Sequence, residues 1–138
     1  MAKRMLSLIV AAAALALFTP LYITASAAQI NCHVPFSFDV NGTTLPAGDY
    51  SIATNGNGTV LLRGLRKSAF VTTVLADSRP DQVGRAKTVF LRTGDRYTLS
   101  EVWTDDGLAR AIPGARKHVE ERARAANLPV EQIEILGM

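Results

Sequence analysis

Polar and apolar residues alternate from residue 33 to residue 40, and this pattern predicts a half-buried β-strand. Pro35 lacks an amide proton, so we expect it at the start of the strand or at a sheet edge. Asn41-Gly42 follows directly, and both residues tolerate positive φ, which predicts a tight reversal of the chain. The predicted apolar face of the strand consists of Val34, Phe36, Phe38 and Val40.

The alternation continues into a predicted hairpin. A turn at 45–48, with the sequence Leu-Pro-Ala-Gly, precedes a strand that opens on Tyr50, Ile52 and Thr54. The segment 55–58 reads Asn-Gly-Asn-Gly, so it predicts a reversal into a second strand over 59–65.

A second hairpin is predicted from 87–92 and 96–104, on either side of Thr-Gly-Asp at 93–95. Period two places Tyr97, Leu99 and Trp103 on one face of the return strand, with Glu101 among them. Glu101 then lies near the edge of the sheet or pairs with an arginine such as Arg92 or Arg63. Asp105-Asp106-Gly107 ends the strand.

The segment 68–76 is β-branched and apolar on both faces, which favours a central strand covered on two sides. The segment 78–85 is polar and contains Pro80 and Gly84, so it is expected to form a loop.

After Pro113 the pattern changes to Ala, Arg, Lys and Glu, which predicts a helix over 115–126. Its apolar stripe is thin, so we expect weak packing; the stripe consists of Ile112, Ala115, Val119, Ala123 and Ala126. Leu128-Pro129 ends the helix, and 130–136 either adds an edge strand or lies against the core. The predicted fold class is all-β, mainly an antiparallel sandwich or partly open barrel of about six or seven strands, with a C-terminal helix.

Residues 1–28 have the features of a secretory signal peptide. Lys3 and Arg4 precede an apolar run of about 14 residues, and small residues occupy 25–28. The run is shorter than the roughly 20 residues that span a bilayer, so cleavage is favoured over an uncleaved anchor. Cleavage after Ala28 is preferred, and cleavage after Ala27 also fits. We therefore expect an exported protein, periplasmic or secreted, with no transmembrane segment after cleavage.

The predicted organisation is a signal peptide at 1–28, an antiparallel β domain at 29–110, a charged helix at 111–127 and a C-terminal tail at 128–138. The chain has 15 Lys and Arg and 12 Asp and Glu, a net charge of +3. Without residues 1–28, which include Lys3 and Arg4, there are 13 Lys and Arg and 12 Asp and Glu, a net charge of +1. This balance does not favour a nucleic-acid partner.

Eight basic residues remain a candidate for a cationic face, if the sheets bring them together. The simpler interpretation is a solvated surface balanced by Asp77, Asp81, Asp95 and Glu101. The eight are Arg63, Arg66, Lys67, Arg79, Arg85, Lys87, Arg92 and Arg96.

Three motifs occur in order along the chain: Val-Pro-Phe-Ser-Phe-Asp-Val at 34–40, Leu-Pro-Ala-Gly-Asp-Tyr at 45–50, and Gly-Asp-Arg-Tyr-Thr-Leu-Ser-Glu-Val-Trp at 94–103. Together they resemble a family of small exported proteins found in many copies in acidobacterial-type soil bacteria. The resemblance covers most of 29–125 and implies export and a compact β-rich domain. It implies no catalytic residue, and Cys32 lies outside its pattern.

The residues themselves predict no catalytic, cofactor-binding or metal site. Cys32 and His33 are adjacent, so on a strand they point to opposite faces and cannot share a metal ion. Cys32, the single cysteine, is expected to be buried in a strand. His118 is predicted on a solvated helix. Phe36, Phe38, Tyr50, Tyr97 and Trp103 are expected to fill the core.

The sequence therefore favours an exported, non-enzymatic β-rich protein with a binding or envelope-associated role, whose specific partner is unknown. A carrier of a small apolar ligand within a β-barrel is the alternative, because 68–76 is apolar on both faces and the chain contains the aromatic set named above. A hydrolase is the second alternative, and it rests on unassigned Ser, His and Asp residues.

Overall fold

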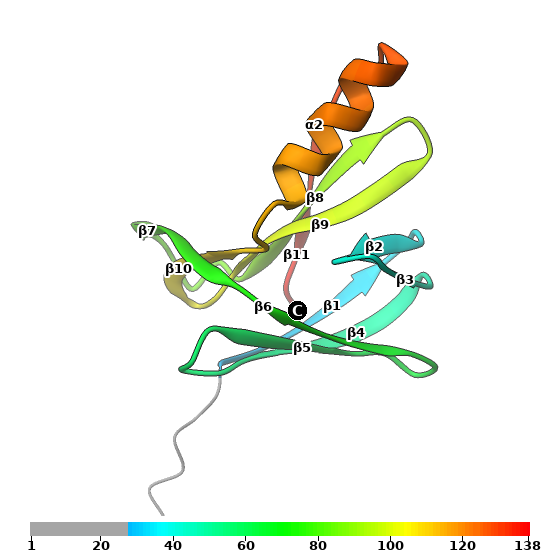
Figure 1. The fold of residues 1–138 in the computed structure, drawn as a ribbon. Coiled ribbons are helices and arrows are strands. Elements are labelled where there is room, and N and C mark those ends of the chain that lie inside the picture. Colours follow the sequence, from blue (N-terminus) through cyan, green and yellow to red (C-terminus); the bar gives the residue numbers. More distant parts are fainter. Residues whose placement is uncertain (1–27) are drawn as a thin grey trace, which may run out of the picture.

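The computed structural model describes residues 28–138, which form eleven strands and one helix (Figure 1). The predicted signal peptide lies outside the described residues, apart from Ala28. The elements are β1 (Ala28–Val34), β2 (Phe38–Val40), β3 (Thr43–Leu45), β4 (Gly48–Thr54), β5 (Thr59–Arg63), β6 (Ser68–Thr72), β7 (Val74–Val83), β8 (Lys87–Thr93), β9 (Arg96–Trp103), β10 (Asp106–Ala111), α2 (Ala115–Ala126) and β11 (Glu131–Leu136).

The strands form two sheets. One has the order β1-β4-β5-β6, and the other has the order β11-β8-β9-β10-β7, with β2 and β3 attached through β9. The pairings are antiparallel except at Asp39 and Thr98, where β2 meets β9 in parallel. The sheets are joined where the chain passes from β6 to β7 at Thr73, and where the Met138 amide donates to the Asn31 carbonyl at 2.8 Å. The predicted all-β sandwich with a C-terminal helix is confirmed.

The predicted turns form where the chain requires positive φ. Asn41 and Gly42 have φ of 47° and 84° between β2 and β3, and Gly94 has φ of 59° between β8 and β9. The hairpin of β4 and β5 is also confirmed, with Thr54 opposite Val60. These turns fix the register that places alternate residues of each strand between the sheets.

Aromatic rings form a continuous cluster between the sheets. Phe36 stacks on Tyr97 with ring centres 3.8 Å apart, and its edge meets Phe90 at 5.1 Å. Phe38 contacts both Phe90 and Tyr50 at 5.1 Å and 5.2 Å. The prediction that these residues fill the core is confirmed for all except Trp103, which lies in a separate cluster with Val89 and Ala109.

A β-bulge explains the different position of Trp103. The register between β8 and β9 shifts between Val89 and Phe90, so that Leu99 faces Phe90 and Glu101 faces Val89. Because a bulge inserts one residue, side chains beyond it point to the opposite face. Leu99 and Val102 therefore share the core, whereas Trp103 is buried on the outer face. The prediction that Tyr97, Leu99 and Trp103 share one face is wrong beyond the bulge.

Several expected boundaries are also corrected. The strand over 34–40 is interrupted at Pro35–Ser37, and its first part begins earlier, at Ala28. The segment 78–85 is mainly strand, because β7 continues to Val83 along β10. Residues 28–138 contain eleven strands and not six or seven, because several predicted strands are divided into shorter ones.

The segment 68–76 is not a single central strand. It breaks at Thr73, whose amide donates to the Gly58 carbonyl at 2.7 Å, and both β6 and β7 end their sheets. Phe70, Val74 and Leu75 are exposed at 62%, 53% and 60%. In β6 the side chains of Ala69 and Val71 therefore serve the core and Phe70 meets solvent, whereas Val74, Leu75 and Ala76 of β7 are all exposed.

The helix α2 packs on β8 and β9 through Ala115, Val119 and Ala123, as the thin apolar stripe predicts, whereas Ala126 is exposed. Asn127 ends the helix in the left-handed region, with φ of 54°. The tail then pairs with β8 as the edge strand β11, so 128–138 belongs to the β domain.

Candidate functional site

A cleft of about 410 Å³ lies between the start of α2 and the β2–β3 hairpin; we call it the α2 cleft. Its wall includes Asp39 and Thr98 at the single parallel contact of β2 and β9, and Arg96 at the start of β9. The helix contributes His118 and Arg122. Side chains that are distant in the sequence thus meet because β2 inserts beside β9 and α2 folds back over the same sheet.

The polar groups of the α2 cleft are connected. Arg122 donates from Nη2 to the Thr98 hydroxyl at 3.3 Å, and Thr98 is only 8% exposed. Arg96 Nη2 lies 3.8 Å from the Asp39 carboxylate, which also accepts from the Thr44 hydroxyl at 2.7 Å. The cleft therefore has two guanidinium groups and one carboxylate, and the nearby Arg96 partly neutralises the charge of that carboxylate.

A larger cleft of about 790 Å³ lies where β1, the turn before β8 and the C-terminal tail meet. Its lining has two basic residues, Arg85 and Lys87, and two acidic ones, Asp105 and Glu134. Lys87 donates to Glu134 at 3.1 Å, so these charges are already paired. Although it is larger, this cleft offers a ligand less unbalanced charge than the α2 cleft.

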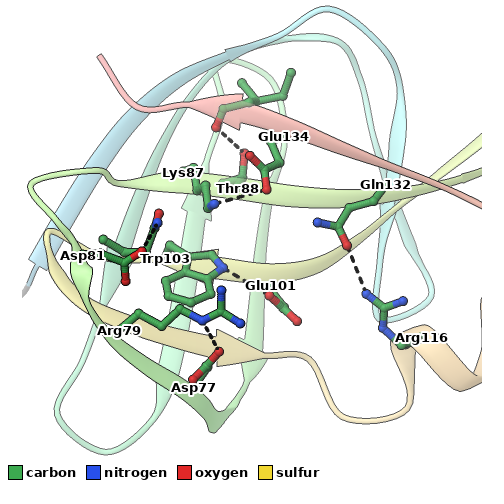
Figure 2. A network of polar contacts seen from close by, with 12 residues as sticks. Asp77, Arg79, Asp81, Lys87, Thr88, Glu101, Trp103, Arg116, Gln132 and Glu134 are labelled. Carbon is green, nitrogen blue, oxygen red and sulfur yellow. Dashed lines mark hydrogen bonds and ion pairs between the residues drawn. The ribbon is translucent and has the colours of Figure 1, made fainter.

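Trp103 is covered by long polar side chains (Figure 2). Its indole N–H donates to the Glu101 carboxylate at 3.1 Å, and Lys87 Nζ lies 5.2 Å from the ring centre. Arg79, paired with Asp77 at 2.9 Å, lies 5.9 Å from the same ring. Trp103 is 6% exposed, so these side chains cover the indole ring and leave no open ring face for a ligand.

The expectation for Glu101 changes at this cover. Glu101 was expected near the edge or paired with Arg92 or Arg63, but its carboxylate accepts from Trp103 instead. The bulge causes the difference, because it turns Glu101 and Trp103 to the same outer face.

The eight basic residues do not form one cationic face. Arg63, Arg66 and Lys67 lie on or beside β5 and β6, in the other sheet from most of the remainder. Four of the others pair with carboxylates, which favours the interpretation as a balanced, solvated surface. Three of those carboxylates, Asp39, Glu131 and Glu134, were not among the predicted counter-charges.

Cys32 is buried between the sheets, as predicted, and its thiol is free. Burial raises the pKa of its thiol, and the nearby Thr88 hydroxyl opposes this shift weakly. His33 points to the other face and pairs with Asp49 at 2.7 Å. Within residues 28–138 no group of three or more His, Cys, Asp or Glu could hold a metal ion.

Three exposed apolar side chains follow one another along the joint of the two sheets. Phe70 of β6 and Val74 and Leu75 of β7 form what we call the β6–β7 patch. Phe70 lies directly opposite Leu61 of β5, which is half-buried and extends the apolar surface across the sheet. Val74 and Leu75 point to opposite faces of β7, and exposed apolar side chains this close along the chain are a feature of protein interaction sites.

Comparisons with protein-family models, with curated proteins and with solved structures each gave no match. No relative therefore supplies a function for these surfaces. Among residues 28–138, the one helix falls short of the length and apolar character that crossing a membrane requires.

Sequence reasoning identified no site residue in the α2 cleft. Asp39 was assigned to a strand, Arg96 to a general basic surface and Arg122 to a solvated helix face. Their convergence depends on the parallel contact of β2 and β9, which no local pattern encodes. A weak signal was available at the start of α2, where Gly114 offers no side-chain N-cap and the first turn contains no acidic residue.

Proposed function

We propose that this chain is an exported, non-enzymatic β-rich protein whose role is to bind another protein, and that it is similar in kind to the small exported bacterial proteins that its motifs resemble. The composition of residues 1–28 supports export. Cleavage after Ala28 would remove one residue of β1 and leave the pairs from Gln29–Ala53 to Val34–Gly48 between β1 and β4.

The β6–β7 patch is the observation that carries the binding role. The nine residues 68–76 contain no charge, and their pattern is that of a strand covered on both faces. The folded chain buries Ala69 and Val71 of β6 and leaves Phe70 of β6 in solvent, together with Val74 and Leu75, which point to opposite faces of β7. A protein partner would complete the burial for which these residues are suited.

The chemistry of the patch specifies the partner. The patch residues themselves carry no charge, and Arg110 of β10 lies opposite Leu75, so we expect a complementary surface that is mainly apolar. Beyond Ala76 the character of β7 changes, because Asp77, Arg79, Pro80 and Asp81 are features that protect a sheet edge from pairing. The partner is therefore expected to contact 70–75 and not the second half of β7.

The alternative of an apolar-ligand carrier loses its motive. Of its two grounds, the apolar strand at 68–76 covered on two sides is replaced by two edge strands, and the aromatic set, apart from Trp103, packs between the sheets. The space between the sheets is filled by fully buried side chains such as Phe38, Phe90 and Leu99.

Affinity capture from the exported fraction of the source bacterium tests this function. The double variant Phe70→Ser, Leu75→Ser should lose a partner that the wild type retains. Val83→Ser is the matched control, because Val83 is 59% exposed on the same strand but outside the patch. A partner retained equally by all three proteins, or no partner in repeated captures, would contradict the proposal.

Analytical ultracentrifugation of the wild type distinguishes a second copy from a different protein as the partner. A dimer that the patch variant abolishes would replace the expected foreign partner and contradict that part of the proposal.

Export is tested separately by the intact mass of the protein recovered from its host. Processing after Ala28 or Ala27 supports export, and recovery from the cytoplasm with Met1 retained contradicts it.

A further inference from the structure

We infer that the α2 cleft binds a small phosphate ester that carries hydroxyl groups. Arg96 and Arg122 come from two different elements and line the same space of about 410 Å³. Guanidinium groups match the oxygens of phosphate in a planar, two-pronged geometry. Such a pair at a concave surface is a chemical basis for recognising a phosphate group.

The contacts that Arg96 and Arg122 make within the protein leave both guanidinium groups available to bind an anion. Arg122 donates to a neutral hydroxyl, that of Thr98, and makes no ion pair with a carboxylate of residues 28–138. Arg96 is 64% exposed and its contact with Asp39 is long, at 3.8 Å. A phosphate can therefore bind both groups without breaking a short ion pair.

The position of Arg122 is built into the fold. Thr98, which accepts its hydrogen bond, is more than nine-tenths buried in β9 and lines the cleft. Because the Thr98 backbone is fixed by its pairing with Leu91 and Asp39, the hydroxyl holds Arg122 at the cleft wall. The first turn of α2 adds no acidic side chain that would repel an anion.

Size and the remaining polar group indicate more than an inorganic ion. The volume lies in the range of small-molecule sites, whereas a phosphate ion alone would leave most of it empty. Asp39 would repel the phosphate but can accept a hydrogen bond from a ligand hydroxyl beside it. Ile112 and Pro113 supply apolar surface against which a carbon skeleton can lie. A sugar phosphate combines these features.

Isothermal titration with glucose 6-phosphate, glucose and inorganic phosphate, at fixed ionic strength, tests the site. Glucose 6-phosphate should bind saturably and more tightly than phosphate, and glucose should not bind. Arg96→Gln and Arg122→Gln should each weaken the binding of glucose 6-phosphate about tenfold or more, because each removes a charged hydrogen bond to the phosphate. Asp39→Asn should weaken the binding of glucose 6-phosphate more than the binding of inorganic phosphate.

Arg124→Gln is the matched control, because Arg124 is exposed on the same helix but does not line the cleft. An equal loss in Arg124→Gln, unchanged binding in the Arg96→Gln, Arg122→Gln double variant, or no saturable binding by the wild type would overturn the inference. Amide chemical shifts of the wild type localise the ligand independently of any variant: shifts centred on Thr98 and Ala115 support the site, and shifts centred elsewhere overturn it. The patch variant Phe70→Ser, Leu75→Ser should retain binding, so this site and the protein interface can fail separately.

Discussion

Val102→Ala tests the burial of Val102 in the main core, where the β-bulge in β9 places it. An uninterrupted alternation from Tyr97 would place the side chains of Leu99 and Val102 on different faces of the sheet, with Val102 on the outer face. The observed register places both side chains in the main core. Val102 is 0% exposed. Its truncation removes two buried carbons, worth about 1.6 kcal/mol in transfer free energy, and the cavity left behind adds about 1 kcal/mol.

The free energy of unfolding should therefore fall by about 2–3 kcal/mol, a large share of the total of about 5–15 kcal/mol for a domain of this kind. Urea unfolding followed by far-ultraviolet circular dichroism and by the fluorescence of Trp103, the single tryptophan, measures it. Val83→Ala is the matched control, because Val83 is 59% exposed and its truncation should cost less than about 0.5 kcal/mol. Equal costs for the two valines would refute the burial of Val102 in the main core.

The remaining predictions concern two glycines and the buried thiol. Gly84→Ala and Gly107→Ala place alanine at similar left-handed φ, +76° and +80°, but an added Cβ meets nothing at Gly84 and would clash with the Arg79 carbonyl oxygen at Gly107. The first should cost about 1–2 kcal/mol from φ alone, and the second clearly more; equal costs in thermal unfolding would contradict this. Cys32 should react with a thiol reagent only on unfolding, and rapid labelling of the native protein would show that it is accessible. Because burial raises the Cys32 pKa, the unfolded chain loses this proton first, so stability should fall above about pH 9, and less so in Cys32→Ala.

Local chemistry predicted the turns and the helix well. The Asn41-Gly42 reversal depends on residues that tolerate positive φ, and the helix depends on propensity and on the stop at Asn127, Leu128 and Pro129. Each of these signals lies within a few residues of the feature that it specifies. The order of strands and the bulge depend on partners far away in the sequence, so they could not be predicted in the same way.

The bulge left a trace that alternation alone did not reveal. Val102 and Trp103 are adjacent and both apolar, and so are Val89 and Phe90 on the partner strand. A sheet covered on both faces has adjacent apolar residues on paired strands, and a bulge exchanges which of them faces the core. The segment 68–76 has the same composition without that cover, because local pattern specifies which residues can be buried and not what lies above them.

Ligand binding in the α2 cleft would also stabilise the contact between α2 and the sheet. The helix is held by Ala115, Val119 and Ala123, small side chains that bury little area, and by the 3.3 Å bond from Arg122 to Thr98. A phosphate that bridges Arg122 on α2 and Arg96 on β9 would bind the docked helix and not a detached one. At 100 times the Kd, this preference amounts to about 2.7 kcal/mol. Hydrogen exchange should then slow in α2 far more than in β4 and β5, whereas uniform slowing, or none, would show that the ligand does not join the helix to the sheet.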